Sequence, residues 1–247
     1  MRQLWLLPSM LLVSLSSMGE EFLPDKVYGE QECVECHQKV SAEIMGNHRQ
    51  GRHGSGSIGC SDCHGSSHNG SLARSRANRS CTQCHTDVEQ RSYETSKHGV
   101  ILTLEESGWD LTKPLATVSV RTPGCAYCHL SDGDHAMEPK ADGDPKICGK
   151  CHSTRYLKIL TSSGEAMEEV GEMKVLEAKW LLKWKGGDLT QQEQKELLDS
   201  VKRHRHNLHL GVVHHSPDFQ WWHGQPALDG DLIRIRSKIA EHRWTSN

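Results

Sequence analysis

The most regular pattern of apolar and polar positions lies in the last third of the chain. Apolar side chains recur at spacings of three and four between residues 166 and 184, and Gly186 and Gly187 follow. This pattern predicts one apolar face of an amphipathic helix that ends at the two glycines. The face consists of Ala166, Val170, Met173, Leu176, Trp180 and Trp184. Met167 shares the helical spacing, so we expect Met167 and Met173 in a hydrophobic core.

Two further helices are predicted after this one. Thr190 and Glu193 form a capping-box pattern that begins the second helix, which stops before Pro217. Its apolar positions are Leu197, Val201, Leu208 and Val212. The third helix carries Leu232, Ile235 and Ile239. Residues 161–247 are therefore predicted to be a helical region of their own.

Residues 20–160 show no comparable periodicity. Gly and Ser are frequent there, and residues 53–59 are predicted to be a loop. We expect sparse regular structure in this part of the chain. The predicted fold class is mainly α, with little or no β: a loop-rich core over residues 20–160 and a C-terminal bundle of about three helices over residues 161–247.

The first 19 residues have the pattern of a secretory signal peptide. Arg2 supplies the positive start, residues 4–15 are mostly apolar, and small residues precede a cleavage site after Gly19. A membrane span needs about 20 apolar residues, so this segment is short for an anchor. We expect cleavage at residue 19 and export to the periplasm or the cell exterior. An uncleaved membrane anchor is the alternative.

The composition leaves the interior short of ordinary core residues. The mean hydropathy is −0.63, and the chain has only two Phe and four Tyr, although aromatic side chains usually supply much of a core's buried area. Some other large apolar group is expected to fill the interior. The net charge of −3 argues against nucleic acid as a partner.

All ten cysteines belong to five Cys-x-x-Cys-His motifs. The cysteines are Cys33 and Cys36, Cys60 and Cys63, Cys81 and Cys84, Cys125 and Cys128, and Cys148 and Cys151. The histidines that follow them are His37, His64, His85, His129 and His152. Two cysteines three residues apart can bind the two vinyl groups on one edge of a porphyrin as thioethers, and the next histidine then lies under the iron. The motifs predict five covalently bound haem c groups with these histidines as proximal ligands.

Zinc sites, disulfides and thioredoxin-like pairs are the alternative interpretations of the cysteine pairs. A zinc site does not require a histidine directly after each pair, and no cysteine remains for a disulfide. Five consecutive matches favour haem. One-electron transfer through the irons is the function that these groups imply.

Each iron also needs a sixth ligand or an open face. Twelve of the 17 histidines lie outside the motifs, and methionines are few. Ligation by two histidines is therefore expected, which implies low reduction potentials. The distal candidates are His48, His53, His68, His98, His135, His209 and His214. His68, His98 and His135 follow haem motifs in short polar loops, whereas His209 and His214 or His215 would reach back from the second long helix.

The sequence resembles the hydroxylamine oxidoreductase branch of the multihaem cytochromes, which is related to the cytochrome c nitrite reductases. The resemblance spans roughly residues 60–240. It rests on Cys60-Ser-Asp-Cys63-His64-Gly65, Ser96-Lys-His98-Gly99, Pro123-Gly-Cys125-Ala-Tyr-Cys128-His129, Cys148-Gly-Lys-Cys151-His152-Ser-Thr-Arg-Tyr156-Leu157, and residues 209–224. It implies a haem cluster backed by a long helical bundle, with His98, His135 and the C-terminal histidines as distal ligands.

The chain departs from that family where the oxidative chemistry takes place. The family's oxidoreductases carry eight haems, whereas this chain matches the last four of them and adds one at Cys33. Hydroxylamine-oxidising members link a C-terminal Tyr to the catalytic haem, but no Tyr follows Tyr156 here, and the comparable stretch offers Phe219, Trp221 and Trp222. Where those members place an Asp-His pair, this chain has Glu89 and Gln90, and a glutamine cannot act as a general base. Hydroxylamine oxidation is not expected.

Three functions remain open from the sequence. The first is an exported pentahaem electron carrier, served by redox partner proteins such as other cytochromes or a quinol-linked donor. The second is a reductase of nitrite or hydroxylamine at an open Cys33 haem, which depends on whether His48 or His53 reaches that iron. The third is a subunit of a larger multihaem assembly or filament, and a homo-oligomer is also compatible with the sequence.

Overall fold

The computed structural model describes residues 26–114, 121–137 and 144–245. The predicted signal peptide, residues 1–19, lies outside these ranges. The described residues form helices and connecting turns, with no strand among them, so the predicted mainly-α class is confirmed. No helix in the described ranges combines the length and the apolar character needed to cross a membrane.

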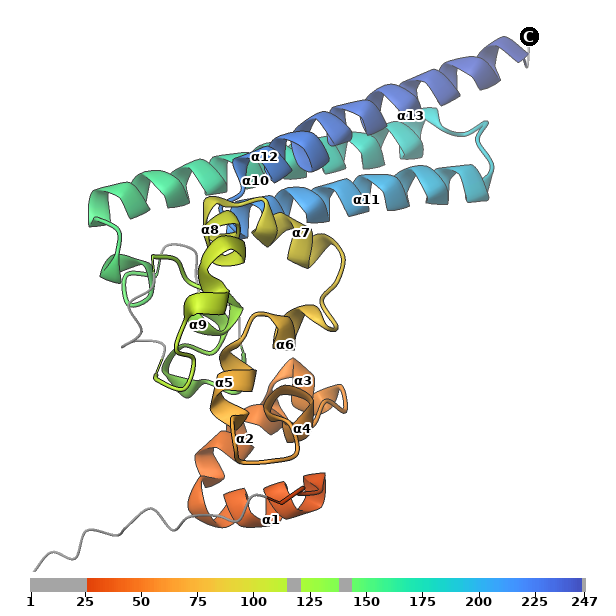
Figure 1. Cartoon of the computed structure of the whole chain (residues 1–247). Helices are drawn as coiled ribbons and strands as arrows, with labels where there is room; N and C mark the ends of the chain where they lie inside the picture. The colour runs from red at the N-terminus through yellow and green to blue at the C-terminus, as the bar shows by residue number, and fades with distance from the viewer. Residues whose placement is uncertain (1–25, 115–120, 138–143, 246–247) are drawn as a thin grey trace, which may run out of the picture.

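Short helices make up the N-terminal part and three long helices the C-terminal part (Figure 1). The short ones are α1 (Glu30–Val40), α2 (Ala42–Gln50), α3 (Arg52–Ser55), α4 (Cys60–His64), α5 (Ser71–Arg76), α6 (Arg79–Thr82), α7 (Val88–Glu94), α8 (Lys97–Glu105), η1 (Glu106–Gly108), α9 (Cys125–His129), η2 (Ser131–Gly133) and η3 (Cys148–Lys150). The later ones are α10 (Thr154–Lys185), α11 (Gln191–Val213), α12 (Pro217–Phe219), the π-helical turn η4 (Gln220–Gly224) and α13 (Gln225–Thr245).

The long helices begin and end where their capping residues place the boundaries. Ser153 caps α10, since its hydroxyl accepts the backbone N–H of Tyr156, and α10 ends before Gly186. The predicted capping box of α11 is confirmed: the Thr190 hydroxyl accepts the Glu193 N–H, and the Glu193 carboxylate accepts the Thr190 N–H. The third predicted helix is α13.

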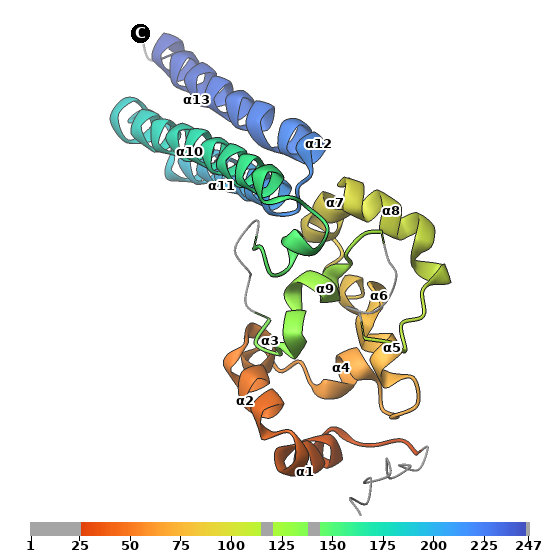
Figure 2. The ribbon, with the colours of Figure 1, turned by 90° about the vertical axis from the view of Figure 1, so that its left-hand side faces the viewer.

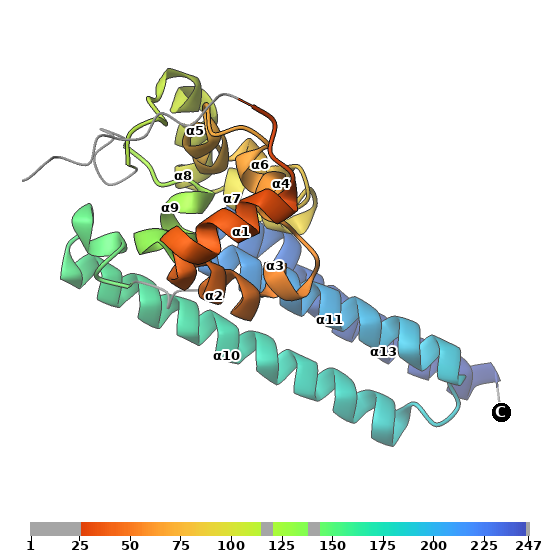
Figure 3. The same cartoon turned by 90° about the horizontal axis from the view of Figure 1, so that it is seen from below.

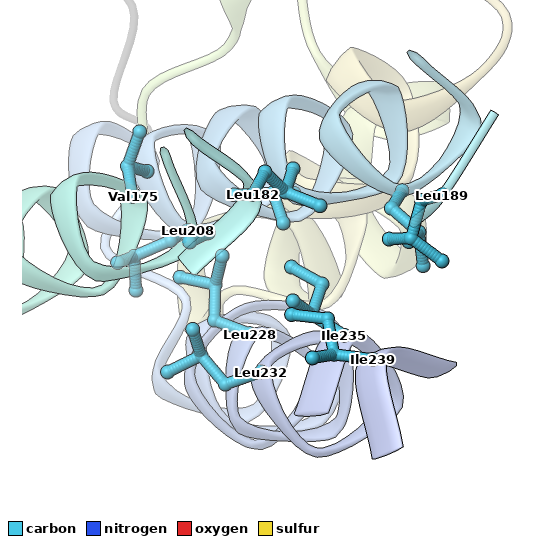
Figure 4. Packing of buried hydrophobic residues seen from close by; sticks show 11 residues of the cluster. Val175, Leu182, Leu189, Leu208, Leu228, Leu232, Ile235 and Ile239 are labelled. Atoms are coloured by element: carbon cyan, nitrogen blue, oxygen red, sulfur yellow. The ribbon is translucent and has the colours of Figure 1, made fainter. Parts of the chain in front are cut away.

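The core of the bundle lies between α10, α11 and α13. It consists of Val175, Ala178, Leu182, Leu189, Leu197, Val201, Leu208, Leu228, Leu232, Ile235 and Ile239 (Figure 4). Gly171 of α10 lies against Leu208, and a Cβ atom there would clash with the leucine side chain. The close approach of α10 and α11 therefore depends on a residue without a side chain.

The apolar face predicted for α10 is not the face that packs on the core. Met173, Leu176, Trp180 and Trp184 are all more than half exposed, so the expectation that Met173 lies in the core is wrong. Met167 does pack against the core. The buried side instead carries Leu157, Gly171, Val175, Ala178 and Leu182. Both sides of α10 have apolar residues at helical spacing, and the side with small residues allows the closer approach of neighbouring helices.

Residues 26–114 hold more helix than predicted. Residues 53–55 belong to α3 and not to a loop. His98 lies in the first turn of α8, not in a loop, because the Ser96 hydroxyl accepts the Gly99 N–H and begins a helix there. His68 and His135 do lie in short turns, as predicted.

Candidate haem-binding sites

Each Cys-x-x-Cys-His motif adopts a helical turn. The first lies inside α1, the second forms α4 and the fourth forms α9. In the third and fifth, the histidine N–H donates to the carbonyl of the first cysteine four residues earlier, as in an α-helix. Residues three and four apart share one face of a helical turn. Both sulfur atoms and the imidazole of a motif can therefore reach the same porphyrin.

Four of the motif histidines face a second imidazole across a gap. The ring centroids are 6.4 Å apart for His37 and His68, 6.2 Å for His64 and His135, 6.0 Å for His85 and His53, and 6.0 Å for His152 and His98. Rings that merely touch have centroids anywhere from about 4.5 to 7 Å apart. The observed separations recur at nearly the same value in four places.

The gap between the rings fits one iron atom. A first-row metal binds an imidazole nitrogen at about 2.0–2.1 Å, and the ring centroid lies about 1.1 Å behind that nitrogen. Two rings on opposite sides of one iron would thus have centroids about 6.3 Å apart. The observed separations of 6.0–6.4 Å fit this arrangement. Each of the four pairs could therefore hold a haem iron between its two rings.

His129, in the fourth motif, lies near His214, the C-cap residue of α11. His214 is half-buried, and desolvation lowers its pKa to about 4, with the charge of His129 as the second cause. The position of His214 depends on α7, because the Ser92 side-chain oxygen lies 2.7 Å from its Nδ1 atom. His214 is thus the second imidazole available to the His129 haem.

Several of these histidines have Nδ1 in a hydrogen bond with a neutral group. The His37 Nδ1 atom lies 2.8 Å from the Ser41 hydroxyl oxygen, and the His135 Nδ1 atom donates to the Gly133 carbonyl at 2.7 Å. A hydrogen bond at Nδ1 orients the ring and leaves Nε2 free for a metal. His37 and His135, like His214, therefore keep Nε2 available for a metal.

Burial keeps the rings of His98 and His53 neutral. It lowers the pKa of His98 to about 4, with the neighbouring His215 and His152 as further causes, and it also lowers the pKa of His53, where His85 and His48 add to the effect. A neutral imidazole has a nitrogen lone pair for iron, whereas the protonated ring has none. The fold thus presents these histidines in the form that binds metal.

The motifs follow one another in space in the order of the sequence. Burial raises the pKa of Cys60 to about 12, and Glu30 and Cys33 contribute to the rise. Burial is also the largest cause of the raised pKa of Cys63, and the nearby Cys81 and Cys84 add to it. Further along, Cys81 and Cys125 share a hydrogen bond, and Cys148 neighbours Cys128. Figures 1 and 2 show the motif-bearing helices rising in this order from α1 toward the bundle.

Two polar side chains cap the N-termini of motif helices, and neither was predictable from a local sequence pattern. The Glu30 carboxylate of α1 accepts the backbone N–H groups of Cys60 at 2.8 Å and of Ser61 at 3.1 Å. The Asn78 side-chain oxygen accepts the Cys125 N–H at 2.8 Å. Each bond satisfies a free amide at a helix N-terminus and ties one motif to the preceding one.

Two of the predicted distal candidates do not face a motif histidine. The Nδ1 atom of His209 lies 3.0 Å from the Glu168 carboxylate, and its side chain is half exposed. His48 lies on α2 near His53. The ring opposite His37 is that of His68, and His53 faces His85 of the third motif instead. Sequence order did not reveal this pairing, because His53 precedes its partner motif.

Comparisons with known proteins agree with this picture. Residues 53–138 match a family described as "Seven times multi-haem cytochrome CxxCH", and residues 15–65 match "Cytochrome c554 and c-prime". The structure is similar to a chain of the Kuenenia stuttgartiensis reducing HAO-like protein complex, with a TM-score of 0.53 and 16% sequence identity over 88% of this chain and 86% of that one. The family matches indicate covalently bound haem c and electron transfer, and the structural likeness shows a shared fold.

Proposed function

We propose that this multihaem c-type cytochrome carries five haems, each with two histidine ligands, and serves as an electron carrier. The observation that carries the proposal is the pairing of imidazoles. The rings of four motif histidines lie beside a second imidazole, with centroids 6.0–6.4 Å apart. The remaining motif histidine, His129, has the half-buried His214 beside it. An iron with two protein ligands exchanges electrons without binding a substrate.

The haem groups supply one-electron iron chemistry when bound, and the chain's residues determine the reduction potential and the orientation of the ligand rings. Paired histidine ligands give lower potentials than a Met–His pair. The hydrogen bonds between Ser41 and His37 and between Ser92 and His214 fix the rings, so little rearrangement is needed between the two oxidation states. The distal ligands are then His68, His135, His53, His214 and His98, in the order of the motifs.

The order of the motifs gives the path that electrons would follow through the protein. The cysteines of each motif lie near those of the next, from the first motif to the fifth, so electrons would enter at the α1 end and leave beside α10, or the reverse. Redox partner proteins would dock at these two ends. We place the protein in the periplasm or the cell exterior, because c-type haem is attached outside the cytoplasm and the first 19 residues have the pattern of a signal peptide.

A reductase remains the second candidate because the structural neighbour belongs to a complex described as reducing. Such an enzyme needs an iron with an open face. The Cys33 haem was the expected place for one, but His68 faces His37 there. Reduction of nitrite or hydroxylamine would therefore require a distal histidine to leave its iron.

Two measurements on the purified holoprotein distinguish the candidates. Intact-mass spectrometry should give the polypeptide plus five haem masses, and a reductive titration should take up five electrons per chain. Steady-state assays with artificial donors and acceptors should show neither hydroxylamine oxidation nor reduction of nitrite or hydroxylamine. Rapid consumption of either substrate by the reduced protein would favour the reductase over the carrier.

A further inference from the structure

The far end of the helical bundle carries three exposed tryptophans. Trp180 and Trp184 lie four residues apart on one side of α10 and are 51% and 64% exposed, and Trp244, near the end of α13, is 82% exposed. Figures 1 and 3 show the end of α10, the start of α11 and the end of α13 together at this end of the bundle, away from the motif-bearing helices. We call residues 177–196 and 234–245 the tip of the bundle.

The tip is basic in a chain that is slightly acidic. It contains eight Lys and Arg against five Asp and Glu, which give a net charge of +3, whereas the whole chain has a net charge of −3. Three of the carboxylates are already engaged within the tip: Glu177 binds Arg236, Glu241 lies 3.3 Å from Lys238, and Glu193 lies 3.3 Å from His242. An anionic surface is therefore the complementary partner.

Cations of the tip lie directly beside its tryptophans. The Nζ atom of Lys183 is 4.9 Å from the ring centroid of Trp184, and that of Lys185 is 5.9 Å from the ring centroid of Trp180. A groove of about 400 Å³ separates α10 from α13, and its walls include Trp180, Leu181, Lys185, Arg236, Arg243 and Trp244. The tip thus offers apolar rings and, next to them, groups that bind phosphate.

We propose that the tip docks on the surface of a bilayer that contains anionic phospholipids. Tryptophan is enriched at the level of the lipid headgroups, because its ring is apolar and its N–H group is polar. Lysine and arginine beside it are attracted to the negative charge of the bilayer surface. A protein partner fits this pattern less well, since the centres of protein–protein interfaces are depleted in lysine. Docking of this kind needs no spanning helix.

Docking by the tip would hold the haem motifs away from the bilayer. Tyr156 stacks on His152 of the fifth motif, with ring centroids 4.8 Å apart, and 24 residues of α10 separate Tyr156 from Trp180. At 1.5 Å per residue this distance is about 36 Å. The motif-bearing helices would therefore stay open to redox partners in the aqueous phase. The docking itself does not depend on the proposed electron transfer.

Flotation of the holoprotein with lipid vesicles tests the docking. Vesicles of phosphatidylcholine and phosphatidylglycerol in equal parts should carry the protein at low ionic strength, whereas vesicles of phosphatidylcholine alone should not. Added salt should release the protein, because it screens the attraction between exposed charges. Failure to float with the anionic vesicles would overturn the proposal and leave a protein as the partner of the tip. Equal flotation with both kinds of vesicle would overturn it as well, since the charge of the tip would then play no part.

Two tryptophan pairs locate the contact. The double variant Trp184→Ser/Trp244→Ser should bind anionic vesicles at least about tenfold more weakly, because burial of one aromatic side chain in an apolar environment is worth about that factor. The matched control is Trp221→Ser/Trp222→Ser, which removes two exposed tryptophans of η4 and should bind as the wild type does. Unchanged binding by the first variant, or an equal loss in the control, would show that the tip is not the docking surface.

A charge reversal tests the basic side chains in the same assay. One cation near an anionic bilayer is worth about a factor of five in binding, so Lys183→Glu should weaken binding by at least that factor. Lys158→Glu, at the exposed opposite end of α10, is the control and should not. Equal binding by both variants would contradict the role of the tip. The haem content, read from the absorption spectrum, is independent of these results, so failure of the haem assignment and failure of the docking are distinguishable.

Discussion

The surplus histidines fall into two groups according to what their ring contacts. His135 and His214 have Nδ1 hydrogen-bonded to a carbonyl or a hydroxyl group. His204 and His209 instead have Nδ1 against the carboxylates of Asp231 and Glu168. An Nδ1 atom held in a hydrogen bond of either kind leaves Nε2 as the nitrogen that can bind a metal. The assignment to iron therefore rests on the ring that each histidine lies beside: His135 lies beside the motif histidine His64.

The assignment of His68 to the Cys33 haem can be tested directly. In His68→Ala the iron would lose its distal ligand, because His68 is the ring opposite His37. We expect a new high-spin ferric signal of about one iron per chain and carbon monoxide binding by the reduced protein. His48→Ala is the matched control and should keep the wild-type spectrum. Identical spectra for both variants would contradict the assignment.

Glu30 is expected to stabilise the first two motifs. Burial alone would raise its pKa, but the amide donors of Cys60 and Ser61 outweigh that effect and hold the pKa below its usual value. Charge-assisted bonds of this kind contribute about 1–2 kcal/mol. Glu30→Gln should therefore lower the free energy of unfolding by about that amount. The control is Glu35→Gln, which should not lower it, because the Glu35 carboxylate accepts from the side chain of Gln31 on the same helix and not from the amides of another motif.

The effect of Glu30 should also depend on pH. A carboxyl group with a lowered folded pKa stabilises the protein above its unfolded pKa, and the contribution is lost as the pH falls through the folded value. The difference between wild type and Glu30→Gln, measured by denaturant unfolding, should therefore be largest near neutral pH and should shrink below about pH 4. A difference that stays constant into acid would show that the charge is not involved.

At the scale of elements, the sequence predicted where α10 ends, but neither its beginning at Thr154, inside the part predicted to be loop-rich, nor the side that it buries. Its end at the two glycines and the capping box of α11 were predictable, because caps are local signals. Its buried side was not, since α10 has two apolar sides and only the packing of Gly171 against Leu208 selects one. The pairing of His53 with His85 was hidden for a similar reason: it depends on how α3 and α6 are arranged in space.

Paired glycine substitutions test the packing of α10. Gly171→Ala introduces a Cβ atom that would clash with Leu208, and overpacking of this kind costs about 1–3 kcal/mol. Gly46→Ala in α2 is the control, since its Cβ would meet open space and alanine is favoured over glycine in a helix by about 0.5–1 kcal/mol. Thermal unfolding followed by circular dichroism should show a lower midpoint for the first variant only. An unchanged midpoint for Gly171→Ala would contradict the close packing.

At the scale of the whole molecule, the haem motifs form a series that leads from α1 to the bundle. The bundle reaches the last two motifs: His214 lies near the fourth motif, and Tyr156 in the first turn of α10 stacks on His152 of the fifth. The number of motifs and the helical class followed from the sequence alone. The sequence predicted ligation by two histidines, and its distal candidates include all five assigned partners. It could not pair each candidate with its motif, because the partners come from turns, from α3 and α8, and from the C-terminal cap of α11.

The central claim is that every iron lies between two histidines. Quantitative electron paramagnetic resonance of the oxidised holoprotein tests it most directly, because six-coordinate irons with two imidazole ligands are low-spin and five-coordinate irons are high-spin. The account predicts five low-spin ferric irons per chain and no high-spin signal. A high-spin signal amounting to one iron per chain would contradict it, since one haem would then have an open face for substrate.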